Sequence, residues 1–320
     1  MKGEKAMGMK GFKGFEKDFS CGGKQCEENT TYEEYGEGCC YKGVMHFYED
    51  PWEVLNHYDL VDGNGNLSEF AEVEALGQVW NDGEKRATNK IHVGAKLGLK
   101  GFLKACIDFT LEKTKYESNG TNLSGNSAQI GSSGDYAQIG SSGDYAQIGS
   151  SGYYAQIGSS GDSAQIGSSG YSAQIGSSGY SAQIGSSGDS AQIGSSGDSA
   201  KIGSSGDSAK IGSSGYCAKI GSSGDCAKIG SSGDCAKIGS SGDSAQINST
   251  GEDAVIMCAG RKSKAKGKKG SWITLVEWVK DEEKGRYVPI CVKTERVDGE
   301  KIKEDTYYTL KNGEFSEVEE

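Results

Sequence analysis

A nine-residue unit repeated in tandem is the feature that most restricts how this chain can fold. The unit reads Gly-Ser-Ser-Gly-Asp-Ser-Ala-Gln-Ile at residues 185–193, and its Ala occurs in fourteen copies from Ala128 to Ala245. Between Gly131 and Gly242 the two glycines, two serines, Ala and Ile never change, and all variation falls in three columns. Drift in a disordered linker would scatter changes over every column, so the pattern indicates a folded repeat.

Strand geometry explains which columns vary. Successive side chains of a strand point to opposite faces, so the Ala and Ile of each unit share one face, and the Gln or Lys between them points to the other. The sequence therefore predicts a narrow stack with Ala and Ile inside and variable polar residues outside. The glycines are expected to have positive φ at the corners, and the Ser-Ser pair to hydrogen-bond backbone in the turns.

A stack of many units is more stable than one coil. Burial of one Ile contributes about 2 kcal/mol, whereas ordering each of nine residues costs about 1 kcal/mol or more. Only hydrogen bonds between many coils offset that difference. The predicted fold class is mainly β, a β-solenoid with two nonapeptide units per coil between an α+β head and a small antiparallel β cap. A flexible Gly/Ser linker is the alternative.

Composition along the chain predicts three segments. Residues 1–125 are expected to form the α+β globular head with a capping helix, residues 126–259 the solenoid, and residues 260–320 a basic loop and the β cap. The basic run 261–269 is expected to be a solvated loop between solenoid and cap, with contact to a polyanion as the alternative.

Local patterns predict the main elements. Asp50 before Pro51 and Glu53 is typical of a helix N-cap, so a short helix is expected over residues 51–58, after a strand near 44–48. The other expected elements are a strand at 70–76, a helix at 101–113 set against the first repeat, and cap strands at 272–278, 287–292, 306–310 and 314–318, the last two joined by the turn Asn312-Gly313.

Charge and hydropathy restrict the partners. The net charge is −11, which argues against general nucleic-acid or anionic-membrane binding. The lysine- and acid-rich start shows no signal peptide, and no run is long enough to span a membrane, so a cytoplasmic protein of a bacterial host is expected. The ten cysteines are then expected to be free thiols, and no cofactor is predicted.

One cysteine-rich stretch leaves a zinc site open. Cys21, Cys26, Cys39, Cys40 and His46 have ligand chemistry, but their spacing is loose and adjacent cysteines seldom bind one ion, so buried thiols are favoured.

A second stretch mimics calcium-binding chemistry. Residues 62–66, Asp-Gly-Asn-Gly-Asn, begin like an EF-hand loop, but Leu67 occupies the required glycine position and Val73 the twelfth, so a hairpin turn is expected. The histidines show neither triad nor metal spacing; they are His46, His57 and His92.

Rows of tyrosine and lysine on the solenoid surface are the predicted contacts, because aromatic rows on a rigid surface suit binding of protein or glycan. The candidate binding residues are Tyr136, Tyr145, Tyr154, Tyr153, Tyr171, Tyr180, Lys201, Lys210 and Lys219. Three cysteines, Cys217, Cys226 and Cys235, share one variable column. Alternate units place Cys217 beside Cys235, near enough for a strained disulfide bridge, but drift from serine at the surface is favoured.

The repeat resembles two known repeat families. It is similar to the calcium-binding RTX nonapeptide, although Ser132 fills a glycine position there, Asp135 lies one place early and Ile139 one place late. It is also similar to the Ser-X-Ala-Ile-Gly repeats of trimeric adhesin heads, whose coils are longer. Both resemblances imply a β-roll rather than calcium binding or adhesion.

The two ends of the chain resemble an uncharacterised family of phage and prophage proteins that carries nine-residue repeats between such ends. The segments that carry this resemblance are residues 10–18, 46–55, 90–94, 262–267 and 297–303. The resemblance implies a non-enzymatic structural or interaction protein whose solenoid is a rigid display or spacer surface for a host or phage protein or a glycan. Two alternatives stay open, an enzyme whose head resembles ADP-ribosyltransferases and a phage counter-defence binding protein.

Overall fold

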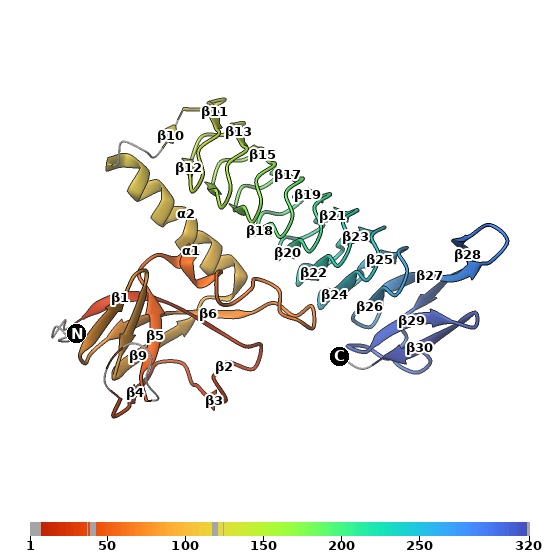
Figure 1. Cartoon of the computed structure of the whole chain (residues 1–320), viewed down its shortest axis with the longest axis horizontal. Coiled ribbons are helices and arrows are strands. Elements are labelled where there is room, and N and C mark those ends of the chain that lie inside the picture. Colours follow the sequence, from red (N-terminus) through yellow and green to blue (C-terminus); the bar gives the residue numbers. More distant parts are fainter. Residues whose placement is uncertain (1–7, 37, 39–42, 117–120, 124, 319–320) are drawn as a thin grey trace.

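The computed structural model describes residues 8–36, 38, 43–116, 121–123 and 125–318. It confirms the predicted fold class. The protein is mainly β, and a solenoid of about eight turns over residues 129–275 lies between an N-terminal head and a small antiparallel C-terminal unit (Figure 1). Among the described helices, none is long and apolar enough to cross a bilayer.

The head is built on a seven-stranded antiparallel sheet. Its strands are β1 (Met9–Phe15), β4 (Thr30–Glu33), β5 (Met45–Tyr48), β6 (Glu69–Ala75), β7 (Val79–Asp82), β8 (Lys85–Thr88) and β9 (Lys90–Lys96). They are arranged in the order β4-β9-β6-β1-β5-β8-β7. A separate hairpin pairs β2 (Ser20–Cys21) with β3 (Lys24–Gln25). The positions of β5 and β6 confirm the two strands predicted in the head.

Helix α1 (Pro51–Val54) begins where the N-cap pattern predicts. The Asp50 carboxylate accepts a hydrogen bond from the Trp52 N–H at 2.9 Å. The helix is shorter than predicted because the chain continues through hydrogen-bonded turns up to Tyr58. The buried Trp52 indole N–H donates to the Thr110 hydroxyl at 2.8 Å, which joins α1 to the second helix, α2 (Gly98–Tyr116).

The solenoid consists of short strands that alternate between two sheets. One sheet, called the free sheet here, contains β11 (Gln129–Ser132), β13 (Gln147–Ser150), β15 (Gln165–Ser168), β17 (Gln183–Ser186), β19 (Lys201–Ser204), β21 (Lys219–Ser222), β23 (Lys237–Ser240) and β25 (Val255–Cys258). The other, the covered sheet, contains β10 (Thr121–Leu123), β12 (Gln138–Ser141), β14 (Gln156–Ser159), β16 (Gln174–Ser177), β18 (Gln192–Ser195), β20 (Lys210–Ser213), β22 (Lys228–Ser231), β24 (Gln246–Ser249) and β26 (Lys264–Lys266).

Strands within each sheet are parallel and in register, so that Ile139 pairs with Ile157 and Ile148 with Ile166. Each pairing joins residues eighteen apart, which confirms two units per coil. The isoleucines and alanines form a continuous core, with Ile157 and Ala155 fully buried. From the second unit onward the first serine of the repeat is buried as well, as at Ser141 and Ser150.

The corners of the coils differ from the prediction in which residues have positive φ and in the hydrogen bonds of the serines. Positive φ belongs to the residue before the Ala, for example Ser208 at 56° and Cys226 at 56°, and not to the repeat glycines. The second glycine of each unit has another role, because a Cβ at Gly206 would lie 2.1 Å from the Gly188 carbonyl oxygen of the preceding coil. The expected hydroxyl-to-backbone bonds are also wrong for the inward serines, since the buried Ser150 hydroxyl has no hydrogen-bond partner among the described residues.

Helix α2 lies along the solenoid instead of closing its end. It packs against five strands of the covered sheet, from β10 to β18, and runs beside successive coils (Figure 1). The repeat glycines allow this approach, because a Cβ at Gly194 would lie 2.6 Å from the Leu103 side chain and one at Gly158 would lie 3.3 Å from Ile107. The helix expected as a lid against the first repeat is therefore a side wall along the covered sheet, and it contacts β10 and β12 instead of β11.

The C-terminal unit grows out of both solenoid sheets. Strand β27 (Trp272–Asp281) is parallel to β25 and antiparallel to β28 (Arg286–Arg296). Strand β26 is antiparallel to β29 (Tyr307–Lys311), which forms a hairpin with β30 (Glu314–Val318). Positive φ at Asn312 and Gly313 confirms the predicted hairpin turn.

The basic run is not the solvated loop that was expected. Lys264–Lys266 form β26, which continues the parallel ladder beyond residue 259 by pairing with β24. The Lys266 side chain is buried and its ammonium lies 4.5 Å from the centre of the Tyr307 ring.

The loop at residues 62–66 forms a strap from the head to the far end of the solenoid. The Asp62 carboxylate accepts from the Asn64 and Asn66 N–H groups, both at 2.8 Å, which confirms the predicted tight turn. The Asn248 amide donates to Asn66 at 3.1 Å, and the Tyr307 hydroxyl donates to the Asn64 carbonyl. The loop therefore connects the head with the last coils.

Candidate binding surface of the solenoid

The two corners of each coil form two edges that run along the solenoid. The first edge contains the corners that follow free-sheet strands, and the second edge those that follow covered-sheet strands. Successive units therefore alternate between edges, so the predicted tyrosine columns divide. The first edge carries Tyr136, Tyr153, Tyr154 and Tyr171, whereas the second carries Tyr145, Tyr180 and Tyr216.

The four first-edge tyrosines are joined by a chain of ring contacts, and we call them the tyrosine cluster. The rings of Tyr136 and Tyr154 stack with centres 5.2 Å apart. Tyr171 meets Tyr154 edge-on at 6.3 Å and Tyr153 at 6.4 Å. Exposed fractions from 43% for Tyr154 to 71% for Tyr136 leave a large aromatic surface in solvent.

Backbone geometry holds two of these rings in place. Tyr136 and Tyr154 have φ values of 58° and 55°, a left-handed conformation that a non-glycine residue rarely adopts. The Tyr136 N–H donates to the Tyr153 carbonyl of the next coil at 2.8 Å, and the Tyr154 N–H donates to Tyr171 at 2.9 Å. These bonds between coils fix the corner, so the rings project in one direction at each step.

A cavity of about 470 Å³ adjoins the cluster where the head meets the first edge. We call it the acidic cavity. Its solenoid wall includes Tyr136, Tyr154, Gln138 and Gln156, with Gln138 donating to Gln156 at 3.0 Å. Its head wall is charged and contains Glu49, Asp50, Glu53, Glu84, Arg86 and Lys113.

Burial changes the acidity of the carboxyl groups in this cavity. It raises the pKa of Asp50 to about 6, and burial together with a hydrogen bond to Glu84 raises the pKa of Glu53 to about 7. Glu49 is balanced by the Arg86 guanidinium at 2.8 Å. Asp50 and Glu53 therefore gain negative charge as the pH rises through about 6 to 7, beside stacked aromatic rings. Such a combination suits a cationic group.

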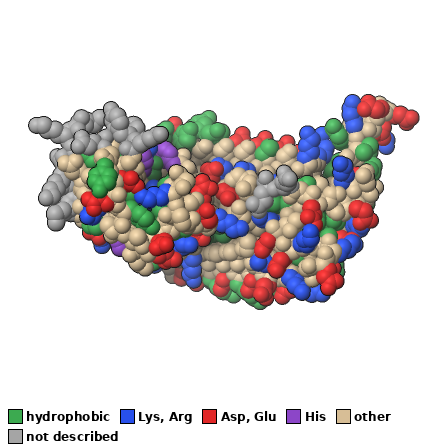
Figure 2. Space-filling model, turned by 90° about the horizontal axis from the view of Figure 1, so that it is seen from below, with side chains coloured by type: hydrophobic (Ala, Val, Ile, Leu, Met, Phe, Trp, Pro, Cys, Tyr) green, Lys and Arg blue, Asp and Glu red, His purple; other side chains and the backbone are tan. Residues whose placement is uncertain are grey.

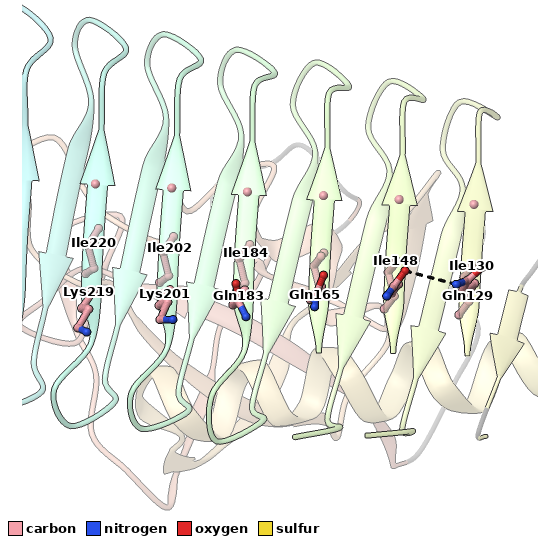
Figure 3. A pocket seen from close by; sticks show the side chains of 18 of the residues that line it. Gln129, Ile130, Ile148, Gln165, Gln183, Ile184, Lys201, Ile202, Lys219 and Ile220 are labelled. Carbon is pink, nitrogen blue, oxygen red and sulfur yellow. Dashed lines mark hydrogen bonds between the residues drawn. The ribbon is translucent and has the colours of Figure 1, made fainter. Parts of the chain in front are cut away.

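The predicted lysines do not share one surface. Lys201 and Lys219 project from the free sheet in register with Gln129, Gln165 and Gln183 (Figure 3). They line a shallow groove of about 1090 Å³ that runs along seven strands. The groove exists because the first glycine of each unit has no side chain to fill it.

Lys210 instead lies on the covered sheet, where its ammonium pairs with Asp59 of the head at 2.5 Å. The structure therefore assigns it to the contact between head and solenoid. On the face seen in Figure 2, acidic and basic side chains intermingle and do not form a patch of one sign.

Among the described residues, two of the candidate zinc ligands, Cys21 and Cys26, belong to the same cluster of the head core. The Cys21 thiol is 3.0 Å from the Tyr58 hydroxyl, and Cys26 is buried in the head core. Cys39 and Cys40 lie outside the described residues, so the zinc alternative is untested. The histidines occupy different elements, with His46 on β5, His57 after α1 and His92 on β9.

Sequence reasoning missed the acidic cavity. Glu53 was recognised only through its place in a helix start, and Glu84 lies in a turn between β7 and β8. No local pattern brings these carboxyl groups to Tyr136, because the meeting depends on how the head docks against the solenoid. The tyrosine cluster could have been predicted from two units per coil, because residues eighteen apart are then neighbours, as are Tyr136 and Tyr154 or Tyr153 and Tyr171.

Comparison with known proteins gives a match for the head alone. Residues 9–105 match a family described as a domain of unknown function (DUF7666). Neither a curated protein nor a solved structure matches the chain. The matched region includes Asp50, Glu53 and Glu84 but ends before the first tyrosine of the solenoid, so the family describes half of the acidic cavity and none of the cluster.

Proposed function

We propose that the protein is a non-enzymatic interaction protein whose solenoid is a rigid shaft that presents the tyrosine cluster to a partner. The observation that supports this most strongly is the stacking of exposed tyrosines at the mouth of the acidic cavity. Aromatic rings offer a large contact area at low entropic cost and are enriched where binding energy concentrates. Carboxyl groups beside them favour a partner that inserts a basic group.

The partner class follows from these two features together. A protein or peptide with a Lys or Arg side chain would place its aliphatic stem on the tyrosine rings and its charge near Glu53 and Asp50. A glycan would use the rings alone. Lys201 and Lys219 supply a second, more polar contact surface on the free sheet.

Origin in a phage or prophage is part of this proposal. It is supported by the segments at both ends of the chain that resemble the phage family. The natural partner would then be a host or phage protein, or a glycan, met in the cytoplasm of a bacterial host.

The proposal is tested by replacing each tyrosine with the residue that its column carries elsewhere. The first-edge variant combines Tyr136→Ser, Tyr154→Ser, Tyr153→Asp and Tyr171→Asp. We expect these replacements to preserve the fold, because Ser already occupies the left-handed corner at Ser163, and Asp144 already accepts the N–H of the next coil at 2.9 Å. The matched control on the second edge combines Tyr145→Ser, Tyr180→Asp and Tyr216→Asp.

Binding is measured for the full chain on arrays of basic peptides, neutral peptides and glycans. We expect the first-edge variant to lose at least tenfold in affinity for basic peptides that the unmodified chain binds, and the control to bind like the unmodified chain. Equal behaviour of the two variants, or no selection of basic over neutral peptides, would contradict the proposal.

A further inference from the structure

Three successive units carry a cysteine in the same column, at Cys217, Cys226 and Cys235. Because successive units alternate between edges, Cys217 and Cys235 lie one coil apart on the second edge, and Cys226 lies alone on the first. All three are free thiols at least partly open to solvent. This pair is separate from the tyrosine cluster and from the acidic cavity.

The two paired cysteines have almost the same geometry. Their φ values are 57° and 56°, so each side chain leaves its corner in the same direction. The Cys217 N–H donates to the Asp234 carbonyl at 2.8 Å, which fixes the register between the two corners. Neighbouring strands are about 4.8 Å apart, so the two cysteines are related by a translation of that size.

A third group lies beside both thiols. The Cys235 thiol lies 3.6 Å from the Tyr216 hydroxyl oxygen, to which it donates. The same hydroxyl also interacts with the Cys217 thiol. The phenol oxygen can accept from a thiol or lie against an ion held by the two sulfurs.

The spacing suits a bridging ion better than a direct bond. A disulfide needs Cβ atoms about 3.5–4.5 Å apart, whereas translation by one coil keeps them about 4.8 Å apart. A zinc–thiolate bond is about 2.3 Å long, and soft-metal–thiolate bonds of similar length give a linear sulfur–metal–sulfur unit of about 4.6 Å. The coil spacing matches that unit without movement of the backbone.

The number of ligands restricts the ion. Within the described part of the chain, no group of three or more His, Cys, Asp or Glu side chains is arranged to hold a metal. Zinc requires four ligands in structural sites, whereas soft ions such as Cu(I) select thiolates and accept two. We propose that Cys217 and Cys235 form a two-coordinate site for a soft monovalent metal ion, Cu(I) or an ion of the same class.

The binding reaction of the metal ion needs neither an oxidant nor a reductant. Two thiols and one monovalent ion give one anionic bis(thiolate) complex and release two protons, and no atom changes its oxidation state. Affinity should therefore rise with pH, because the ion replaces a proton on each sulfur.

The test titrates the reduced full chain with Ag(I), which has the same charge and ligand preference and no accessible redox change. The variants are Cys217→Ser, Cys235→Ser and the matched control Cys226→Ser. Serine fills this column in neighbouring units, as at Ser208, so all three are expected to fold. The other cysteines are common to the variants and give the same background. Bound silver is counted by native mass spectrometry in the presence of a competing monothiol.

We expect the unmodified chain and Cys226→Ser to hold one more Ag(I) than either paired variant, with at least hundredfold tighter retention. Equal stoichiometry in all four proteins would overturn the proposal. Loss of the extra ion in Cys226→Ser would overturn it as well. Spontaneous formation of a Cys217–Cys235 disulfide in preference to metal binding would show that the pair is a redox bridge instead.

Discussion

At the scale of single residues, two roles that glycine often has, the left-handed corner conformation and close backbone stacking, belong to different residues of the repeat. The left-handed corner is occupied by Ser, Tyr or Cys, because a hydrogen bond to the next coil holds each corner in place. The second glycine of each unit serves close stacking instead. A Cβ at this glycine would point at the carbonyl oxygen of the preceding coil, where there is no room for it.

Two glycines in the same unit test this distinction. Gly206→Ala would set a Cβ 2.1 Å from a carbonyl oxygen, so the coil must shift, and we expect it to lower the free energy of unfolding by about 2–4 kcal/mol. Gly203→Ala on the free sheet meets no atom within 4 Å and should change it by less than about 0.5 kcal/mol. Urea denaturation followed by circular dichroism compares them, and equal effects would contradict the stacking role.

The acidic cavity gives a pH dependence of stability with a definite sign. Burial raises the pKa of Asp50 from 3.8 to about 6, so the folded chain holds this proton more tightly than the unfolded chain. The stabilisation is complete below about pH 4 and is lost as the pH rises through about 6, by up to about 3 kcal/mol for a shift of this size. Asp50→Asn keeps an N-cap residue and removes the titration.

We therefore expect Asp50→Asn to flatten the fall in stability between about pH 4 and 7, measured by denaturant unfolding at several pH values. A fall of the same size in both proteins would show that Asp50 does not titrate in this range. Binding of basic peptides to the unmodified chain should change in the opposite direction and strengthen over the same pH interval.

At the scale of elements, the head contacts the solenoid through helix α2, which packs on the repeat glycines of the covered sheet. Leu103 of α2 is buried and contacts the covered sheet where the repeat carries no side chain. The solenoid thus provides a flat surface for α2, while the free sheet stays open.

Leu103→Ala is expected to lower the free energy of unfolding by about 2–4 kcal/mol, since it leaves a cavity between α2 and the sheet. Leu76→Ala is the control, because Leu76 is 38% exposed and its loss should cost less than about 1 kcal/mol. If Leu103→Ala were as mild as the control in thermal and urea unfolding, α2 would not be packed against the sheet as described.

The elements also show what the sequence could predict. The coil of two units, the inward Ala and Ile, the start of α1 and the turn at Asn312 and Gly313 all follow from local periodicity or turn chemistry. The docking of α2 and the acidic cavity do not, because they depend on which repeat faces the head. The strand in the basic run was not predicted. Lys264–Lys266 keep the alternation of inward and outward side chains that the repeat strands have, but their residues differ from those of the repeat unit.

At the scale of the whole molecule, the head spans much of the solenoid. Helix α2 contacts the early coils, whereas the strap at residues 62–66 reaches Asn248 and Tyr307 near the other end. The number of coils between these contacts is therefore matched to the head. Free variation in repeat number, which the repeats alone would allow, is restricted by this span.

Deletions between the two contacts test that match. Removal of one unit, residues 203–211, moves every later unit to the opposite sheet and turns Asn248 away from the strap. Removal of one coil, residues 203–220, keeps each unit on its sheet and displaces the strap contacts by one strand spacing. We expect the single-unit deletion to lower the melting temperature more than the larger deletion, and the reverse order would contradict two units per coil.

The most direct test of the account is hydrogen–deuterium exchange on the full chain, resolved to peptides of about one coil. The backbone N–H groups of the Gln/Lys-Ile-Gly-Ser strands bond to the neighbouring coil, so they should exchange slowly from β12 to β26, as slowly as the central head strands β1 and β6. Complete exchange of the repeats within seconds, with protection only in the two ends, would show a tether and contradict the shaft on which the binding surface depends.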